Sequence, residues 1–314
     1  MRSANFTLCV AAFALACFYP LVADPYWLTV GILALFYAIV TSSWALLVGY
    51  AGQFSFGHMG FVSLGAYCAA LLMVDLGVPL PIGMIGSLVL AGVVGAVIGF
   101  TCLRMRGPYL AIFTMAFSEV FRIIVLTENE VTGGAGGLEV PPLFHTRSDA
   151  PYFYLGLALL AATLGVMALM TSSRWGLFFR AIRENEQAAA AAGVKVVRFR
   201  VLVFAIASAI AGLAGAFYAP YIGILTPDVG SVDQMGLIVA MAVIGGAESL
   251  TASVIGAIIV EFLIEALRAY GQWRLVLFGA LLLLTVRFAR NGLLALAWDK
   301  MIRFAPMRRP QPAE

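Results

Sequence analysis

Long apolar runs separated by short polar segments dominate the chain. About ten of them approach the roughly twenty residues that a helix needs to cross a bilayer. They cover approximately residues 5–23, 27–50, 54–74, 82–102, 108–127, 152–172, 201–222, 235–248, 251–267 and 273–289. The pattern predicts an all-α, polytopic transmembrane helix bundle that forms a single domain over residues 1–314. Met1–Ala23 also resembles a signal peptide, but its apolar run is long for one, and we expect it to be retained as the first span.

Two of the predicted spans are irregular. The third opens with the Gly-rich, polar stretch GYAGQFSFGHMGFVSLGAY at 49–67, and the eighth is short and breaks at Gly245–Ser249. Backbone groups that are unpaired at membrane depth must be buried in protein or line a water-filled path, and broken spans often mark substrate routes in transporters. Close packing of small residues explains the same pattern equally well. The candidate residues of a translocation path are Gln53, Ser55, His58, Gly245 and Gly246.

The distribution of Lys and Arg along the chain supports the predicted number and orientation of the spans. If the N-terminus lies inside, inside segments hold fifteen of the nineteen Lys and Arg residues, and outside segments hold only Arg147, Arg268 and Arg274. Such a bias is typical of cytoplasmic loops. It places both termini in the cytoplasm, residues 128–150 in an extracytoplasmic loop and residues 173–200 in a cytoplasmic loop.

The cytoplasmic loop is a charged island that reads SRWGLFFRAIRENEQAAAAAGVKVVRFR and holds six of the basic residues. Ala181–Ala192 has strong helix formers, and Gly193 follows where a helix would end. We therefore expect one short exposed helix, with apolar residues around Phe178 holding it against the membrane face. A solvated connector would fit the sequence too, but the smooth surface of Ala188–Ala192 favours docking by another protein.

Composition supports the membrane assignment. Hydrophobic residues make up 62% of the chain and charged residues 11%, and the mean hydropathy is +0.99. A soluble domain has about 25% charged residues. The net charge of +3 does not indicate nucleic-acid binding, because the basic residues are sorted by side. The four cysteines lie in apolar runs, where buried free thiols are expected.

An enzymatic site is poorly supported. The phosphate loop of ATPases requires a lysine after glycine, but Lys195 follows Val194 and Lys300 follows Asp299. If ATP drives transport, it is hydrolysed on another chain. The chain has two histidines and no H-E-x-x-H motif, so we expect no catalytic, cofactor-binding or metal site.

Four ionisable residues fall inside predicted spans: Glu119, Arg122, Glu261 and Glu265. Each costs about 2.5–3.5 kcal/mol at the centre of a bilayer on insertion scales. Glu119 and Arg122 are three residues apart and can neutralise each other on one helix face. Glu261 and Glu265 repel, so one is protonated or Glu265 reaches the interface near Arg268. A proton relay is the alternative for these carboxylates.

The chain resembles the permease subunits of ATP-driven, ABC-type importers of branched-chain amino acids, over residues 27 to 295 approximately. The subtype is the longer, methionine-named permease of the pair in such importers. The matching segments, in order, are GYAGQFSFGHMGFVSLGAYCAALL (49–72), LRMRGPYLAIFTMAFSEVFRIIV (103–125), LTENEVTGGAGGL (126–138), RWGLFFRAIRENEQAAAAAGV (174–194) and AIAGLAGAFYAPYIGILTP (209–227).

The resemblance implies a pore shared with a second related permease, driven by two cytosolic ABC ATPases and supplied by an extracytoplasmic solute-binding protein. It implies a bacterial-type inner membrane, contact with lipid, and no nucleic acid. The family's ATPase-coupling helix maps onto Ala181–Gly193, with candidate residues Ala181, Arg183, Glu184, Asn185, Glu186, Gln187 and Gly193. The broader class often has Glu-Ala-Ala and a distal Ile-x-Leu-Pro here. This chain has Glu186-Gln187-Ala188 and lacks the Pro-ending tail.

The expected function is therefore inward movement of branched-chain or related amphipathic amino acids by alternating access. Two alternatives remain open. The same architecture could import urea, short amides or another small solute. A proton-coupled secondary carrier would instead use Glu119, Glu261 or Glu265.

Overall fold

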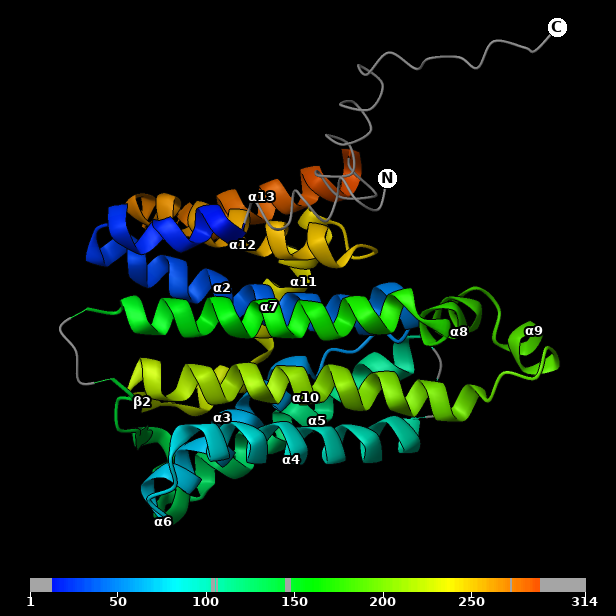
Figure 1. The fold of residues 1–314 in the computed structure, drawn as a ribbon, viewed down its shortest axis with the longest axis horizontal. Coiled ribbons are helices and arrows are strands. Elements are labelled where there is room, and N and C mark those ends of the chain that lie inside the picture. Colours follow the sequence, from blue (N-terminus) through cyan, green and yellow to red (C-terminus); the bar gives the residue numbers. More distant parts are fainter. Residues whose placement is uncertain (1–12, 103–104, 106, 145–147, 272, 289–314) are drawn as a thin grey trace, which may run out of the picture.

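The computed structural model describes residues 13–102, 105, 107–144, 148–271 and 273–288, and almost all of them are helical (Figure 1). A helix at Phe13–Val22 comes first; the beginning of the predicted first span lies outside the described residues. The later elements are α2 (Pro25–Ala45), a π-helix (Leu46–Tyr50), α3 (His58–Val74), α4 (Leu80–Thr101), α5 (Pro108–Thr127), α6 (Asn129–Thr132), the 3-10 helix η3 (Gly134–Gly136), β1 (Leu138–Glu139), α7 (Ala150–Ser172), α8 (Arg174–Glu184), α9 (Glu186–Ala191), α10 (Val196–Ile222), β2 (Ile224–Leu225), the 3-10 helix η4 (Pro227–Gly230), α11 (Val232–Gly245), α12 (Leu250–Ala266), the 3-10 helix η5 (Leu267–Tyr270) and α13 (Trp273–Phe288).

Within the described residues, five helices are long and apolar enough to cross a membrane: α2 with its π-helical extension, α4, α5, α7 and α10. The helices α11 and α12 form an apolar pair bent by 118°, and α3 and Phe13–Val22 are shorter apolar helices. Proline stands in the first turn of α2, α4, α5 and α7, where its fixed φ suits a helix start. The structure thus confirms an all-α membrane bundle, whereas ten spans and cytoplasmic termini remain predictions.

The long helices lie side by side along the long axis of the molecule (Figure 1). α10 packs against α3 and α4, and α2 packs against α7 and α12. Large side chains from several of these helices are fully buried, among them Trp44, Phe61, Phe204 and Phe217. At one end lie α8 and α9. At the other, β1 and β2 form a short antiparallel pair in which Leu138 faces Leu225.

Glycines allow α3 and α10 to pack backbone against backbone. A Cβ at Gly215 would collide with the carbonyl oxygen of Val62, and one at Gly65 would collide with the carbonyl oxygen of Gly212. Small residues serve this purpose in membranes, where helix association depends on close van der Waals contact rather than on hydrophobic burial.

Three predicted boundaries were wrong by several residues. The third span was predicted to start at residue 54, but α3 begins at His58, because positive φ at Gly52 and an extended stretch after it interrupt the helix. The eighth span was predicted at 235–248, but α11 runs from Val232 to Gly245. The seventh was predicted to start at 201, but α10 starts at Val196, so part of the basic loop is helical.

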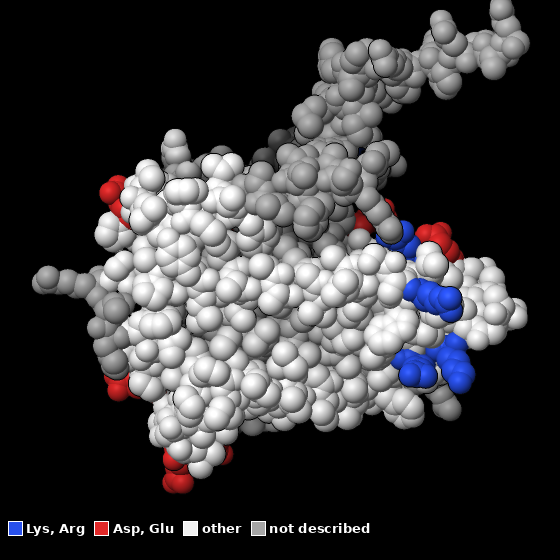
Figure 2. Space-filling view, viewed as in Figure 1, with Lys and Arg blue, Asp and Glu red and all other residues white. Residues whose placement is uncertain are grey.

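Charge is sorted along the long axis. In Figure 2, the visible Lys and Arg side chains gather at the end formed by α8 and the start of α10, while acidic side chains dominate the opposite end. The basic cluster corresponds to the loop that the sequence places in the cytoplasm.

We predict that Gly215→Ala destabilises the protein by about 1–3 kcal/mol, because the added methyl forces α3 and α10 apart. Thermal unfolding of the detergent-purified protein measures this change. Gly165→Ala is the matched control: a Cβ at this position on α7 meets nothing within 4 Å, and alanine is the better helix former. Equal unfolding temperatures for the two variants would contradict the packing argument.

Candidate functional site

The basic loop folds into two helices, which corrects the single helix predicted over Ala181–Ala192. Helix α8 ends at Glu184, and α9 begins at Glu186. Between them Asn185 is extended (φ −156°, ψ 105°), and its side-chain oxygen accepts a hydrogen bond from the Ala188 N–H at 3.0 Å. Asparagine favours this capping position over a helix interior, so Asn185 itself predicts the break between the two helices. Gly193, at φ 84°, follows the end of α9, as expected.

Aromatic side chains hold α8 against the helix bundle. Phe179 is fully buried, and the ring centroids of Phe178 and Phe199, the latter on α10, are 4.8 Å apart. The Arg180 guanidinium lies 5.2 Å from the ring centroid of Tyr50, at the end of the π-helix. The apolar residues therefore attach the loop to the body, as the sequence indicates.

Arg183 joins the loop to both irregular segments of the bundle. Its guanidinium donates hydrogen bonds to the carbonyl oxygen of Gly49 and to the Glu248 carboxylate. Gly49 belongs to the π-helix, and Glu248 lies in the turn between α11 and α12. One side chain thus connects three segments that are far apart in the sequence.

Arg200 makes a second connection and is almost fully buried, with 9% of its side chain exposed. Its Nη1 lies 3.4 Å from Oε1 of Glu186 on α9, and its Nη2 donates to the carbonyl oxygen of Met105 at 3.4 Å. Its own carbonyl oxygen accepts a hydrogen bond from Gln53 Nε2 at 3.2 Å. We refer to Arg183, Arg200 and the groups they contact (Gly49, Gln53, Met105, Glu186 and Glu248) as the loop junction.

The predicted coupling residues therefore divide into two groups. Arg183 and Glu186 reach back to the bundle through the loop junction. The others are exposed on α8, at the break between the two helices, on α9 and after it: Ala181, Glu184, Asn185, Gln187 and Gly193. The sequence did not indicate the partners Arg200 and Glu248. A buried arginine needs a partner, so Arg200, the last charged residue before the apolar part of α10, was a detectable signal.

The candidate path residues of the third span are packed inside the bundle. Gln53, Ser55 and His58 are each at most 5% exposed. The Ser43 hydroxyl lies 2.8 Å from His58 Nε2, and Trp44 Nε1 donates to the carbonyl oxygen of Ser55 at 2.7 Å. Because Ser55 precedes α3, it does not share a helix face with His58.

The other two candidates lie where α11 turns into α12. Gly246 has φ 117°, a conformation that favours glycine. A Cβ at Gly245 would collide with the carbonyl oxygen of Ala252, so this glycine permits the close approach of α11 and α12.

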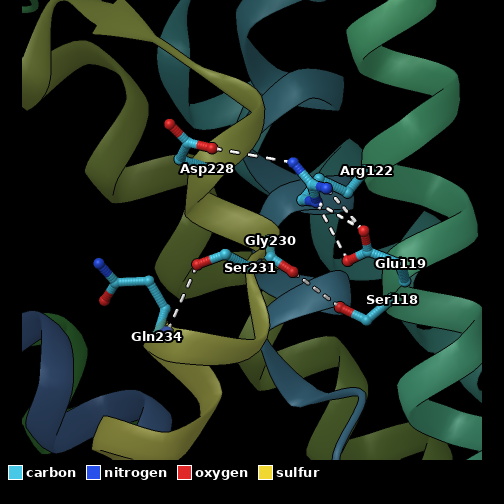
Figure 3. A network of polar contacts seen from close by, with 7 residues as sticks. All are labelled: Ser118, Glu119, Arg122, Asp228, Gly230, Ser231 and Gln234. Atoms are coloured by element: carbon cyan, nitrogen blue, oxygen red, sulfur yellow. Dashed lines mark hydrogen bonds and ion pairs between the residues drawn. The ribbon is translucent and has the colours of Figure 1, made fainter.

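The ionisable residues inside the spans are paired in two of the three cases. Arg122 Nε lies 3.1 and 3.0 Å from the two oxygens of Glu119, and its Nη2 lies 2.6 Å from Oε1 (Figure 3). Glu265 accepts hydrogen bonds from Arg268 at 3.0 Å and from the Tyr26 hydroxyl. Both pairings agree with the spacing in the sequence. Glu261 is buried one turn before Glu265.

We predict that Asn185→Ala loosens α9 by about 0.5–2 kcal/mol, because the Ala188 N–H loses its capping oxygen. Hydrogen exchange of the α9 amides, followed by mass spectrometry, should accelerate. Asn185→Asp keeps an acceptor and is the control. Unchanged exchange in the alanine variant would show that the cap does not stabilise α9.

Comparison with known proteins agrees with these features. Residues 26–286 match the family described as branched-chain amino acid transport system permease component. The chain is 29% identical to the high-affinity branched-chain amino acid transport system permease protein LivM of Escherichia coli K12, over 96% of this chain and 75% of that protein.

Two further relatives extend the comparison. The probable branched-chain amino acid transport permease protein LivM of Methanocaldococcus jannaschii is 25% identical over 87% of this chain and 93% of its own length. The autoinducer 2 import system permease protein LsrC of Salmonella paratyphi B is 27% identical over 77% of this chain and 73% of its own length. No solved structure matches the chain significantly. The chain belongs to the family of permease components of branched-chain amino acid transport systems.

Proposed function

We propose that the chain is one of two permease subunits of an ATP-driven importer that moves leucine, isoleucine, valine or related amphipathic amino acids inward by alternating access. The observation that carries the proposal is the loop junction. Glu186 on the exposed helix α9 contacts Arg200, whose carbonyl group is bonded to Gln53, and Arg183 at the end of α8 contacts both irregular segments of the bundle. Family membership and the likeness to LivM support the cargo class.

The proposed arrangement places the chain in a bacterial-type inner membrane with ten spans and both termini in the cytoplasm. Residues 173–200 then face the cytosol, and residues 128–150 face outward. The sorting of charge along the long axis supports this orientation (Figure 2). The partners are a second related permease, two cytosolic ABC ATPases and an extracytoplasmic solute-binding protein.

In the proposed mechanism, movement of an ATPase displaces α9 through its exposed residues, such as Gln187. Glu186 transmits the displacement to Arg200 and so to the stretch around Gln53. Arg183 transmits it to the π-helix and to the turn between α11 and α12. Both irregular segments then shift together, and the packed residues around His58 and Gly245 separate to open a path.

A proton-coupled carrier is the alternative from another class. The ion pairs of Glu119 and Glu265 argue against two of its three carboxylates as proton carriers. Cargo is a separate question, because the relatives include a permease named for autoinducer 2 import. Competition by urea, short amides and autoinducer 2 against labelled leucine addresses it.

Reconstitution into proteoliposomes tests the class of transporter. We expect the complex that co-purifies with the chain to accumulate labelled leucine when ATP is supplied on the side of the basic loop and the loaded binding protein on the other. The chain alone should accumulate nothing. Accumulation by the isolated chain, driven by a pH gradient without nucleotide, would instead establish a secondary carrier.

The double variant Arg183→Ala, Glu186→Ala should uncouple hydrolysis from uptake, because both ion pairs of the loop junction are lost. We expect leucine uptake to fall by about tenfold or more while ATPase activity continues. The control Arg174→Ala, Leu177→Ala changes exposed residues of α8 that are outside the predicted coupling set. Wild-type uptake in a correctly inserted double variant would refute the role of the loop junction.

A further inference from the structure

A cluster of charged side chains lies at the end of the bundle away from the loop junction. Arg122 and Glu119 are on the later part of α5, and Asp228 is in η4, just before α11 (Figure 3). The α5 end that carries them is remote from Met105, which precedes α5 and contacts the loop junction. We propose that this cluster is a receiving site for an amino acid zwitterion, with the cargo carboxylate on Arg122 and the ammonium on the carboxylates of Glu119 and Asp228. The inference rests on the proposed function and assigns it a cargo contact.

The guanidinium of Arg122 has an edge available for a second carboxylate. Glu119 occupies the edge formed by Nε and Nη2. Among the described residues, Nη1 has no hydrogen-bond acceptor: it faces Asp228 Oδ1 at 3.9 Å, which is an ion pair without a hydrogen bond. Arginine has five donors in a planar fork, and its end-on edge, Nη1 with Nη2, matches a carboxylate in a bidentate manner.

The carboxylates complement the other end of an amino acid. Arg122 lies between Glu119 and Asp228, so the three side chains carry one net negative charge (Figure 3). An ammonium group can donate three hydrogen bonds to these carboxylates, while the carboxylate of the same ligand pairs with Arg122. A zwitterion therefore leaves the net charge of the cluster unchanged but complements both kinds of charged group, whereas an uncharged solute or an anion alone does not.

A buried hydroxyl beside η4 also lacks a partner. Ser63 on α3 is fully buried, and its Oγ has no hydrogen-bond partner within the described part of the chain. A Cβ built on Gly230 would lie 3.4 Å from that Oγ and 4.0 Å from the Arg122 Cβ, so Gly230 stands between the two side chains. The next residue, Ser231, caps the N-terminus of α11, whose partial positive charge also favours a carboxylate.

Solvent exposure makes the site reachable. The Glu119 and Arg122 side chains are 36% and 25% exposed, and that of Asp228 is 82% exposed. Ionised groups on a lipid-facing surface are costly, so partly exposed charges in a span mark a water-filled region. Ser118 on α5 donates to the carbonyl oxygen of Gly230 at 3.0 Å, which holds η4 next to the charges. Cargo bound here would contact both α5 and the segment that leads into α11.

Direct binding tests the proposal without the solute-binding protein. The probe is L-leucine at millimolar concentration, measured by saturation-transfer NMR on the purified complex. We expect leucine to bind the wild type, and Arg122→Gln to weaken binding by about tenfold or more. Leucinamide, which lacks the carboxylate, and 4-methylpentanoate, which lacks the ammonium, should bind more weakly than leucine. Absence of leucine binding to the wild type overturns the proposal.

The chain offers a matched control. Arg268 forms an ion pair with Glu265, three residues earlier, as Arg122 does with Glu119. Arg268→Gln should leave leucine binding unchanged. If Arg122→Gln binds leucine as the wild type does, or if both variants lose binding equally, the assignment of the carboxylate to Arg122 is wrong.

A charge swap separates cargo binding from mutual neutralisation. The double variant Glu119→Arg, Arg122→Glu keeps an ion pair but moves the guanidinium away from Gly230. We expect it not to restore binding, and restoration would leave neutralisation as the only role. If these variants do not fold, Asp228→Asn changes a mostly exposed side chain and tests the ammonium site instead. Unchanged affinity for leucine contradicts that site, and several-fold weaker binding of leucine supports it. A complex that imports leucine without depending on Arg122 defeats only this inference, whereas a complex that imports none defeats the proposed function.

Discussion

The structure depends on one constraint: a peptide group at membrane depth must find its hydrogen-bond partner within the protein. Among the described residues, the chain leaves helical geometry inside the bundle before α3, before α11 and between α11 and α12, and side chains serve the backbone at all three places. Trp44 donates to the carbonyl oxygen of Ser55, and Thr114 accepts from the Phe56 N–H. Ser118 donates to the carbonyl oxygen of Gly230. These few polar side chains provide the hydrogen bonds that irregular backbone needs at membrane depth, where lipid offers none.

The same constraint explains how the segment before α3 and the turn between α11 and α12 are connected to other parts of the protein. Because their backbones are not closed into regular helices, their carbonyl groups remain available to long side chains. Arg183 donates a hydrogen bond to the carbonyl oxygen of Gly49, and Ser253 donates one to the carbonyl oxygen of Gly246. The hydrogen bonds of the basic loop (residues 173–200) thereby reach the least regular parts of the bundle, while its aromatic side chains pack against α10. Mechanical coupling is most effective at such positions, since the long helices resist bending.

Much of this arrangement could be predicted from the sequence, because it is local. Apolar runs predicted the helices, and the spacing of Glu119 and Arg122 predicted their ion pair. Glycine-rich stretches marked both irregular segments. The capping role of Asn185 is also local, but the alanines that follow it favour one continuous helix and so hide the break.

The long-range contacts could not be predicted in this way. Arg183 meets Glu248 across 65 residues, and Gln53 meets Arg200 across 147 residues. Nothing in the spacing of such residues encodes their proximity, which follows only from the packing of α2, α10 and α11. Asp228 joins the Arg122 cluster for the same reason. Sequence periodicity therefore identifies helix faces, while the pairing of distant polar groups requires the tertiary fold.

The shortness of α11 bears on how the chain is made. With 14 residues, the helix is about 21 Å long, well below the hydrocarbon thickness of about 30 Å. As an independent span it would leave a hydrophobic mismatch, and the irregular residues before it would expose unpaired peptide groups to lipid. The helix packs mainly against α12 and α2. We therefore expect α11 to reach its final position only after the ribosome has completed α12.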